Sequence, residues 1–209
     1  MKVYKFGGAS VKDGTGITNL AKIVSAESEN MVVVVSAFGK TTNALEKVLK
    51  AWLTDDNNYK VLLEDIYKIH QSVIAELFSD KSDAGGRIDI SFSALNEYLL
   101  SEKRRDYDFE YDQIVSYGEL WSTIIVAEYL KTKFSEVEWI DIRGNLLTDD
   151  RFRDANILWS ESTNRIKSIF DFKEKRIYVT QGFIGGTVAG QTTTLGREGS
   201  DYTAAILAN

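Results

Sequence analysis

The chain has 209 residues, 44% of them hydrophobic and 27% charged, with a net charge of -6, a composition typical of one globular domain. It contains no cysteine and a single histidine, which excludes disulfides, thiolate metal sites, a cysteine nucleophile and a multi-histidine zinc site. The acidic balance argues against a nucleic-acid partner, and the lack of a membrane-length apolar run or a signal peptide predicts a cytoplasmic protein with no membrane partner.

Strands and helices alternate along the chain. In chain order, the apolar spacing predicts a strand at 3–6, a helix around 17–24, a buried strand at 31–35, helices around 44–52, 62–77, 92–99 and 120–130, a strand at 137–142, a helix around 166–170, a strand at 176–180 and a last helix opening near 200. A polar loop is expected at 80–87, surface charge at 103–110, and a capping box of Asn43 and Glu46 in the second helix. This alternation predicts an α/β fold with a mostly parallel sheet covered on both faces.

Ligands of parallel sheets gather at the carboxyl ends of the strands, and glycine-bearing turns follow several of the predicted strands. Lys5 lies in the first strand beside Gly7 and Gly8. Glycines let backbone amides approach a phosphate, and a fixed ammonium can neutralise charge on a phosphoryl group. An edge lysine beside an ordinary glycine turn is an equally good interpretation of this segment alone.

Residues 192–202 contain a threonine run, two glycines, Arg197, and Ser200 and Asp201 at the start of an apolar helix. A helix start exposes unpaired N–H groups that can hold an anion, and an arginine adds a planar fork that suits a carboxylate or phosphate. The alternative is that Ser200 or Asp201 is simply the helix N-cap.

Two further segments offer polar or backbone groups. Glu119 lies in the first turn of an apolar helix, where it either interacts with the helix dipole or binds a ligand ammonium group. Ser36 and Thr42 follow the buried second strand as small hydrogen-bonding groups. Residues 182–186 suit close backbone approach to a ligand and are equally consistent with a hairpin turn.

Taken together, the segments KFGGAS at 5–10, VVSAFGKTTN at 34–43, SYGEL at 116–120 and VTQGFIGG with TTTLGREGSD within 179–201 resemble the aspartokinase branch of the amino-acid kinase family. The resemblance runs along the whole chain. It implies a three-layer α/β/α sandwich that is truncated at its C-terminus. Residues 1–209 would then be the N-terminal, acceptor-binding part of a catalytic domain, with the ATP-binding half and the regulatory domains absent.

The resemblance also implies roles for individual residues. Lys5 matches the lysine that stabilises the transferring phosphoryl group beside Gly7 and Gly8, and Asp201 matches the residue that orders this lysine. The positions that match acceptor-binding residues are Ser36, Thr42, Glu119 (substrate ammonium), Phe183 (backbone contacts), Arg197 (α-carboxylate) and Ser200.

The implied reaction is transfer of phosphate from ATP, with Mg²⁺, to the side-chain carboxylate of L-aspartate, in a full-length protein that is a homo-oligomer. No resident metal site is implied. Alternatives are another amino-acid kinase, acting on glutamate or N-acetylglutamate, and a non-catalytic amino-acid-binding module. Two positions depart from the family pattern: Ala9 replaces the usual threonine, and Glu198 replaces the usual glycine.

Overall fold

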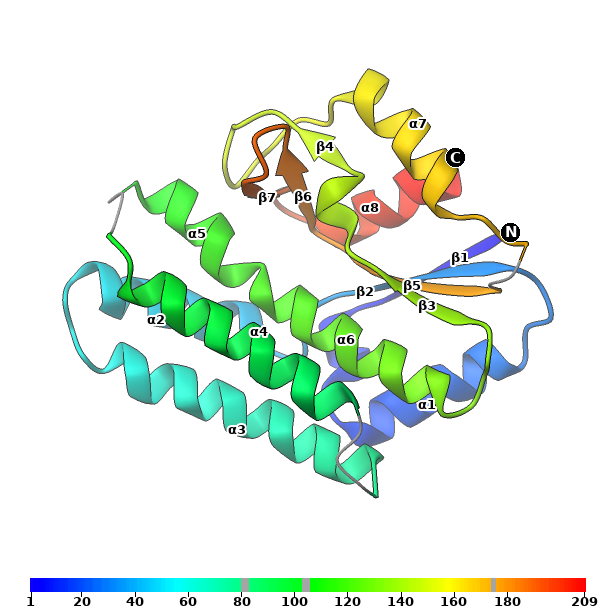
Figure 1. Cartoon of the computed structure of the whole chain (residues 1–209), viewed down its shortest axis with the longest axis horizontal. Helices are drawn as coiled ribbons and strands as arrows, with labels where there is room; N and C mark the ends of the chain where they lie inside the picture. Colours follow the sequence, from blue (N-terminus) through cyan, green and yellow to red (C-terminus); the bar gives the residue numbers. More distant parts are fainter. Residues whose placement is uncertain (80–82, 103–105, 174–175) are drawn as a thin grey trace.

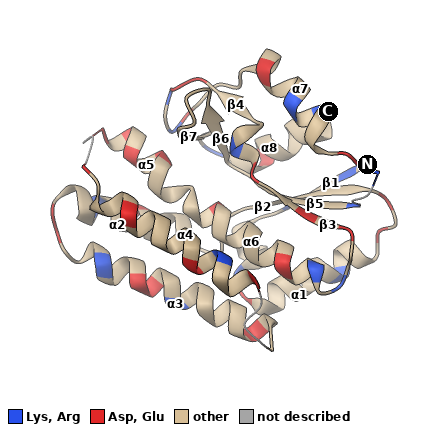
Figure 2. Ribbon diagram, viewed as in Figure 1, with Lys and Arg blue, Asp and Glu red and all other residues tan. Residues whose placement is uncertain are grey.

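The computed structural model describes residues 1–79, 83–102, 106–173 and 176–209. Its central sheet contains β1 (Lys2–Phe6), β2 (Met31–Val35), β5 (Ile177–Gln181) and β3 (Val137–Ile140), in the order β1-β2-β5-β3. All neighbouring pairs are parallel, so the carboxyl ends of these strands lie at one edge. Every residue of β2 and β5 is buried, as the β-branched runs predict. Neither strand contains a charged residue (Figure 2).

Helices cover both faces of this sheet (Figure 1). One face carries α1 (Gly14–Ser25), α2 (Thr41–Leu53), α3 (Tyr59–Leu77), α4 (Asp83–Leu100), α5 (Tyr107–Val115) and α6 (Tyr117–Lys131). The other carries α7 (Trp159–Ile169) and α8 (Gly199–Ala208). The side chains of α6 itself are buried on every face of the helix, as expected of a helix packed between a sheet and other helices. The predicted α/β architecture is therefore confirmed.

A second, small sheet lies on the α7 and α8 side. It contains β4 (Leu147–Thr148), β6 (Ile184–Thr187) and β7 (Thr192–Thr194). β6 pairs antiparallel with β7 and parallel with β4. The hairpin turn expected at 182–186 is wrong: residues 182–183 link β5 to β6, which lie in different sheets, and the hairpin turn lies between β6 and β7. Short helical turns lie at η1 (Gly8–Val11) and η2 (Ile142–Gly144). In the described ranges, no helix combines the length and apolar character needed to cross a bilayer.

Several local predictions were wrong. The loop expected at 80–87 is helical from Asp83 onward, and residues 80–82 lie outside the described residues. The capping box is absent because α2 already begins at Thr41, and Glu46 accepts a hydrogen bond from Tyr107 instead. Tertiary packing therefore overrides the local capping signal.

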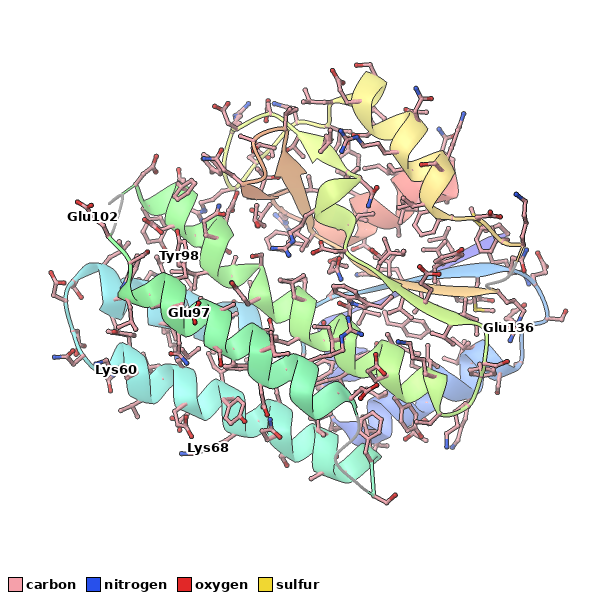
Figure 3. The ribbon with its side chains drawn as sticks, viewed as in Figure 1. Lys60, Lys68, Glu97, Tyr98, Glu102 and Glu136 are labelled. Atoms are coloured by element: carbon pink, nitrogen blue, oxygen red, sulfur yellow. The ribbon has the colours of Figure 1, made fainter. Side chains whose placement is uncertain are left out.

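The surface charge expected at 103–110 is wrong for part of this segment. Residues 103–105 lie outside the described residues. Asp106 caps α5 by accepting hydrogen bonds from two backbone amides, whereas Glu110 is buried. The hydroxyl of Tyr98, which Figure 3 labels on α4, donates to the Glu110 carboxylate. The carboxylate at 110 thus ties two helices together and is not a surface charge.

We expect His70→Phe to reduce the loss of stability on acidification. Burial lowers the pKa of His70 to about 4, and Nε2 has no hydrogen-bond partner among the described residues. The unfolded chain takes up this proton near pH 6.5 and the folded chain only near pH 4, so stability falls as the pH falls between these values. The wild-type loss from this group is of the order of 3 kcal/mol. Urea unfolding at pH 7 and pH 4 checks this, and equal losses in both proteins would contradict it.

Candidate functional site

The loops after β1, β2 and β5 meet the N-terminus of α8 at the carboxyl edge of the central sheet. Beside them, residues of β1, α2, α6, α8 and the segments after β2, β5 and β7 line an open pocket of about 230 Å³. Its lining residues are Lys5, Ser36, Thr42, Glu119, Phe183, Gly196, Glu198, Gly199, Ser200 and Asp201. Most of the candidate side chains that the sequence analysis singled out, from segments far apart in the chain, are therefore gathered in one pocket.

Two contacts join the N-terminus of α8 to the strands. Lys5 Nζ lies 2.9 Å from Asp201 Oδ2, and Ser36 Oγ donates to Ser200 Oγ at 2.9 Å. Ser200 and Asp201 lie within the first turn of α8, and the N-cap is Glu198. The interpretation of Ser200 or Asp201 as an N-cap is therefore wrong, and both side chains are directed to contacts in the pocket.

Glu119 lies in the first turn of α6 and is 3% exposed. Its Oε1 accepts a hydrogen bond from the Ala37 amide at 3.3 Å, whereas Oε2 has no partner in the described part of the chain. Burial raises the pKa of this carboxyl to about 8. A buried acid with an unpartnered oxygen at a pocket wall is suited to a cationic ligand group, because the cation would restore the lost solvation of the ionised form.

The two glycines after β1 have different surroundings. A Cβ at Gly8 would lie 2.5 Å from the carbonyl oxygen of Ala37, because the loops after β1 and β2 are in backbone contact. The Gly39 amide donates to the Gly8 carbonyl at 3.0 Å. A Cβ at Gly7 would have Lys5 Nζ as its nearest neighbour, at 3.6 Å. Gly7 therefore lies beside the candidate phosphate-binding lysine, while Gly8 holds two loops together.

Phe183 lies at the pocket wall with φ = 71°, an uncommon backbone conformation for a residue other than glycine. Its amide donates to Thr203 Oγ1 at 3.1 Å, and its carbonyl accepts from the Leu195 amide at 2.8 Å. The residue is thus held between α8 and the segment that leaves β7. Strained backbone of this kind is often found at functional sites.

Arg197 does not line the 230 Å³ pocket. It is exposed and lines a neighbouring hollow of about 480 Å³. The other lining residues of this hollow are Tyr111, Arg153, Asp154, Phe183, Thr194 and Gly196. Phe183 and Gly196 line both hollows, so the arginine lies next to the pocket across a shared wall.

Sequence reasoning missed Tyr111, Arg153 and the buried Asp112 near this wall. Arg153 has φ = 68°, and its guanidinium lies 4.6 Å from the centre of the Tyr111 ring. Only Asp112 could have been found from the sequence, through its position in α5. Asp112 lies three residues from both Phe109 and Val115, at the spacing of an inward-facing helical position. A carboxylate at such a position needs buried partners.

Glu198, the residue at the usual glycine position, has φ = 58° and is exposed. No ion pair joins it to Arg197 within the described ranges. We expect Glu198→Gly to raise the free energy of unfolding by about 0.5–1 kcal/mol, because glycine adopts this left-handed conformation without steric cost. Thermal unfolding checks this, with Glu198→Gln as a control that removes the charge and keeps the strain. An equal gain in both variants would assign the effect to charge.

The sequence model of the amino acid kinase family matches residues 1–209. Lysine-sensitive aspartokinase 3 of Escherichia coli is 32% identical over 99% of this chain and 45% of its own length. The aspartokinase of Chlamydia trachomatis is 30% identical over 98% of this chain and 45% of its own length. The chain therefore spans less than half the length of these relatives.

Solved structures show the same similarity. E. coli aspartokinase III in complex with lysine and aspartate superposes on the whole chain, and on 46% of its own length, with a TM-score of 0.89 and 30% identity. The complex of the same enzyme with aspartate and ADP gives a TM-score of 0.81 at the same identity and coverage. With its sequence matched from end to end and its fold shared with these structures, the chain belongs to the amino acid kinase family.

Proposed function

We propose that this chain is the acceptor-binding part of an aspartate kinase, which transfers the γ-phosphoryl group of ATP to the side-chain carboxylate of L-aspartate. The observation that carries the proposal is the buried Glu119 carboxylate, whose Oε2 has no partner in the described residues, at the wall of the pocket that contains Lys5. An amino acid with a free ammonium group would supply the missing partner. Relatives named aspartokinases over the whole chain support the choice of aspartate.

The proposed chemistry needs no general base, because a carboxylate is ionised at neutral pH and is itself the nucleophile. The protein must instead bring two anions into line and offset their repulsion. Lys5 would place its ammonium beside the transferring phosphoryl group, and Asp201, 2.9 Å away, would hold that ammonium in place. Arg197 would bind the α-carboxylate from the neighbouring hollow.

ATP and Mg²⁺ belong to the same proposal. Mg²⁺ typically binds one or two carboxylates together with substrate phosphates, and Asp201 is a carboxylate at this edge that lies beside Lys5. Mg²⁺ would supply charge neutralisation on the phosphate oxygens. Binding of ADP to the E. coli relative supports a nucleotide as the phosphoryl donor.

Size and charge favour aspartate over the alternative acceptors. N-acetylglutamate is larger and carries a neutral amide where aspartate has an ammonium group. It would leave the Glu119 carboxylate without a counter-charge. Glutamate keeps the ammonium group and differs by one methylene, so it is the closer competitor.

Ligand binding by isothermal titration calorimetry tests this acceptor. We expect L-aspartate to bind, with much weaker binding of succinate, which lacks the ammonium group, and of β-alanine, which lacks the α-carboxylate. Glutamate and N-acetylglutamate complete the series. Equal binding of aspartate and succinate would contradict the role of Glu119, and tighter binding of N-acetylglutamate would favour the alternative kinase.

Phosphoryl transfer is tested by joining this chain to the C-terminal part of the E. coli relative, which the chain does not match. We expect aspartate-dependent hydrolysis or transfer from ATP that Lys5→Ala abolishes. Aspartate binding without turnover in the joined protein would favour the non-catalytic binding module.

A further inference from the structure

Asp112 is a fully buried carboxylate on α5 that the proposed chemistry does not use. Its Oδ2 accepts hydrogen bonds from the amides of Arg153, at 2.9 Å, and of Thr194, at 2.8 Å. Its Oδ1 accepts from the Thr194 hydroxyl at 2.7 Å. One side chain therefore connects three segments that are far apart in sequence: α5, the loop at 149–155 and β7.

These bonds occupy the outer edge of β7, whose other edge pairs with β6. The neighbouring Gln113 acts similarly at the start of the strand. Its side-chain Nε2 donates to the Thr192 carbonyl at 2.8 Å, and its Oε1 accepts from the Thr192 backbone amide at 3.1 Å. The side chains of α5 thus replace a neighbouring strand along this edge. Gln113 holds the beginning of β7, and Asp112 holds its end.

The end of β7 leads directly into the wall between the two hollows. Thr194 is followed by Leu195, Gly196 and Arg197. The Thr194 carbonyl accepts from the Ala155 amide at 3.0 Å, which docks the loop at 149–155 against the strand. A Cβ at Gly196 would lie 2.8 Å from Asp154 Oδ1, so this loop packs tightly against the residue before Arg197.

We propose that Asp112 is a positioning residue of the acceptor site, which fixes the end of β7 and the loop at 149–155 so that Arg197 can bind the α-carboxylate of the acceptor. The proposal deepens the proposed function and rests on it. Asp112 touches no ligand itself and acts only through the backbone that carries Arg197. Burial raises the pKa of Asp112 to about 6, while the bonds from Arg153 and Thr194 favour the ionised form.

The test compares Asp112→Ala with Gln113→Ala, a matched control that removes side-chain bonds from the far end of the same strand edge. The dissociation constants of L-aspartate and β-alanine are measured by calorimetry, well below the lowest unfolding midpoint. We expect Asp112→Ala to weaken aspartate binding by about tenfold or more, because displacing a positioned group by about 1 Å has large effects. β-Alanine has no α-carboxylate, so its affinity should stay within about twofold.

Asp112→Asn is the conservative variant. Its amide oxygen can keep both backbone bonds and its amide NH₂ group can donate to the Thr194 hydroxyl oxygen, so it should restore aspartate affinity to within about threefold of wild type. Thr194→Val removes the hydroxyl partner at nearly constant shape and should give a smaller loss, again for aspartate alone. If Asp112→Ala does not fold, the dissociation constants of L-aspartate and β-alanine in these two variants test the positioning role.

A purely structural role would lower the unfolding midpoint and leave the ratio of the two dissociation constants unchanged, which would overturn the proposal. An equal loss of aspartate affinity in Gln113→Ala would overturn it as well. If the unsubstituted chain fails to bind L-aspartate, the proposed function fails and this proposal fails with it. If the unsubstituted chain binds and the ratio does not move in any Asp112 or Thr194 variant, only the positioning role is wrong.

Discussion

Binding of L-aspartate at pH 7 is expected to release close to one proton, and Glu119→Gln is expected to abolish both the release and most of the binding. Burial raises the pKa of Glu119 to about 8, so the free protein holds this carboxyl mainly protonated at pH 7. An ammonium group beside the unpartnered Oε2 would favour the ionised form, and the proton would leave as the ligand enters. Loss of a buried charge pair of this kind weakens binding by roughly 2–5 kcal/mol, which corresponds to about thirtyfold to several thousandfold.

Titration calorimetry in two buffers of different ionisation enthalpy measures the released proton directly. Affinity should rise with pH up to about 8 and then level off, since above that pH the carboxyl is already ionised. Glu128→Gln is the matched control on the same helix. Glu128 is also a buried glutamate, but it pairs with Arg87 and Lys131, so proton release should persist in this variant. Binding of aspartate without proton release at pH 7 would show that Glu119 is not the ammonium partner.

Glu119→Gln is also expected to stabilise the free protein at alkaline pH. The folded pKa of Glu119 lies above its ordinary value, so the folded chain binds more protons than the unfolded chain between about pH 4.5 and pH 8, and stability falls as pH rises through this range. Glutamine removes this loss. Opposite effects on stability and on ligand binding are typical of a residue kept for function.

The sequence predicted the central sheet well because its strands carry their own signal. A run such as Met31–Val35 is apolar and β-branched throughout, which is typical of a strand buried on both faces. β4 and β7 carry no such signal, because they are short and their polar threonines are satisfied by neighbours. Thr194, for example, is held by a carboxylate from a helix 82 residues earlier in the chain. No local pattern can reveal such a partner.

The grouping of the candidate site residues could be expected from the sequence only in part. The resemblance placed the candidate residues, and the parallel topology explains why segments after different strands meet in one pocket. The burial of Glu119 and the hydrogen bond from the Ala37 amide to its Oε1 depend on packing between distant segments, so no local pattern reveals them. The left-handed backbone of Glu198 at the N-cap position was equally hidden. A glutamate is a poor indicator of a left-handed residue, so the sequence suggested Ser200 or Asp201 as the helix cap.

Gly8→Ala and Gly7→Ala are expected to change stability in opposite directions, although the two glycines are neighbours in one motif. A methyl group at Gly8 would lie 2.5 Å from the Ala37 carbonyl oxygen and 3.1 Å from that of Gly39, and these backbone atoms cannot move without separating the loops after β1 and β2. We expect a loss of about 3 kcal/mol in the free energy of unfolding, the upper range for overpacking. At Gly7, φ is -75° and the nearest contact is an ordinary 3.6 Å, so alanine should stabilise by about 0.5 kcal/mol.

Urea unfolding of the two variants and the wild type measures these changes, and calorimetry on the folded proteins measures aspartate binding. Gly8→Ala should also weaken binding, because the loop it displaces supplies the Ala37 amide that holds Glu119. Gly7→Ala should leave aspartate binding intact. Equal stability of the two variants would mean that the loops after β1 and β2 are free to separate. The expected difference would instead show that Gly8 is needed to join two strand ends around the acceptor pocket, and that only Gly7 remains available for close approach to a phosphate.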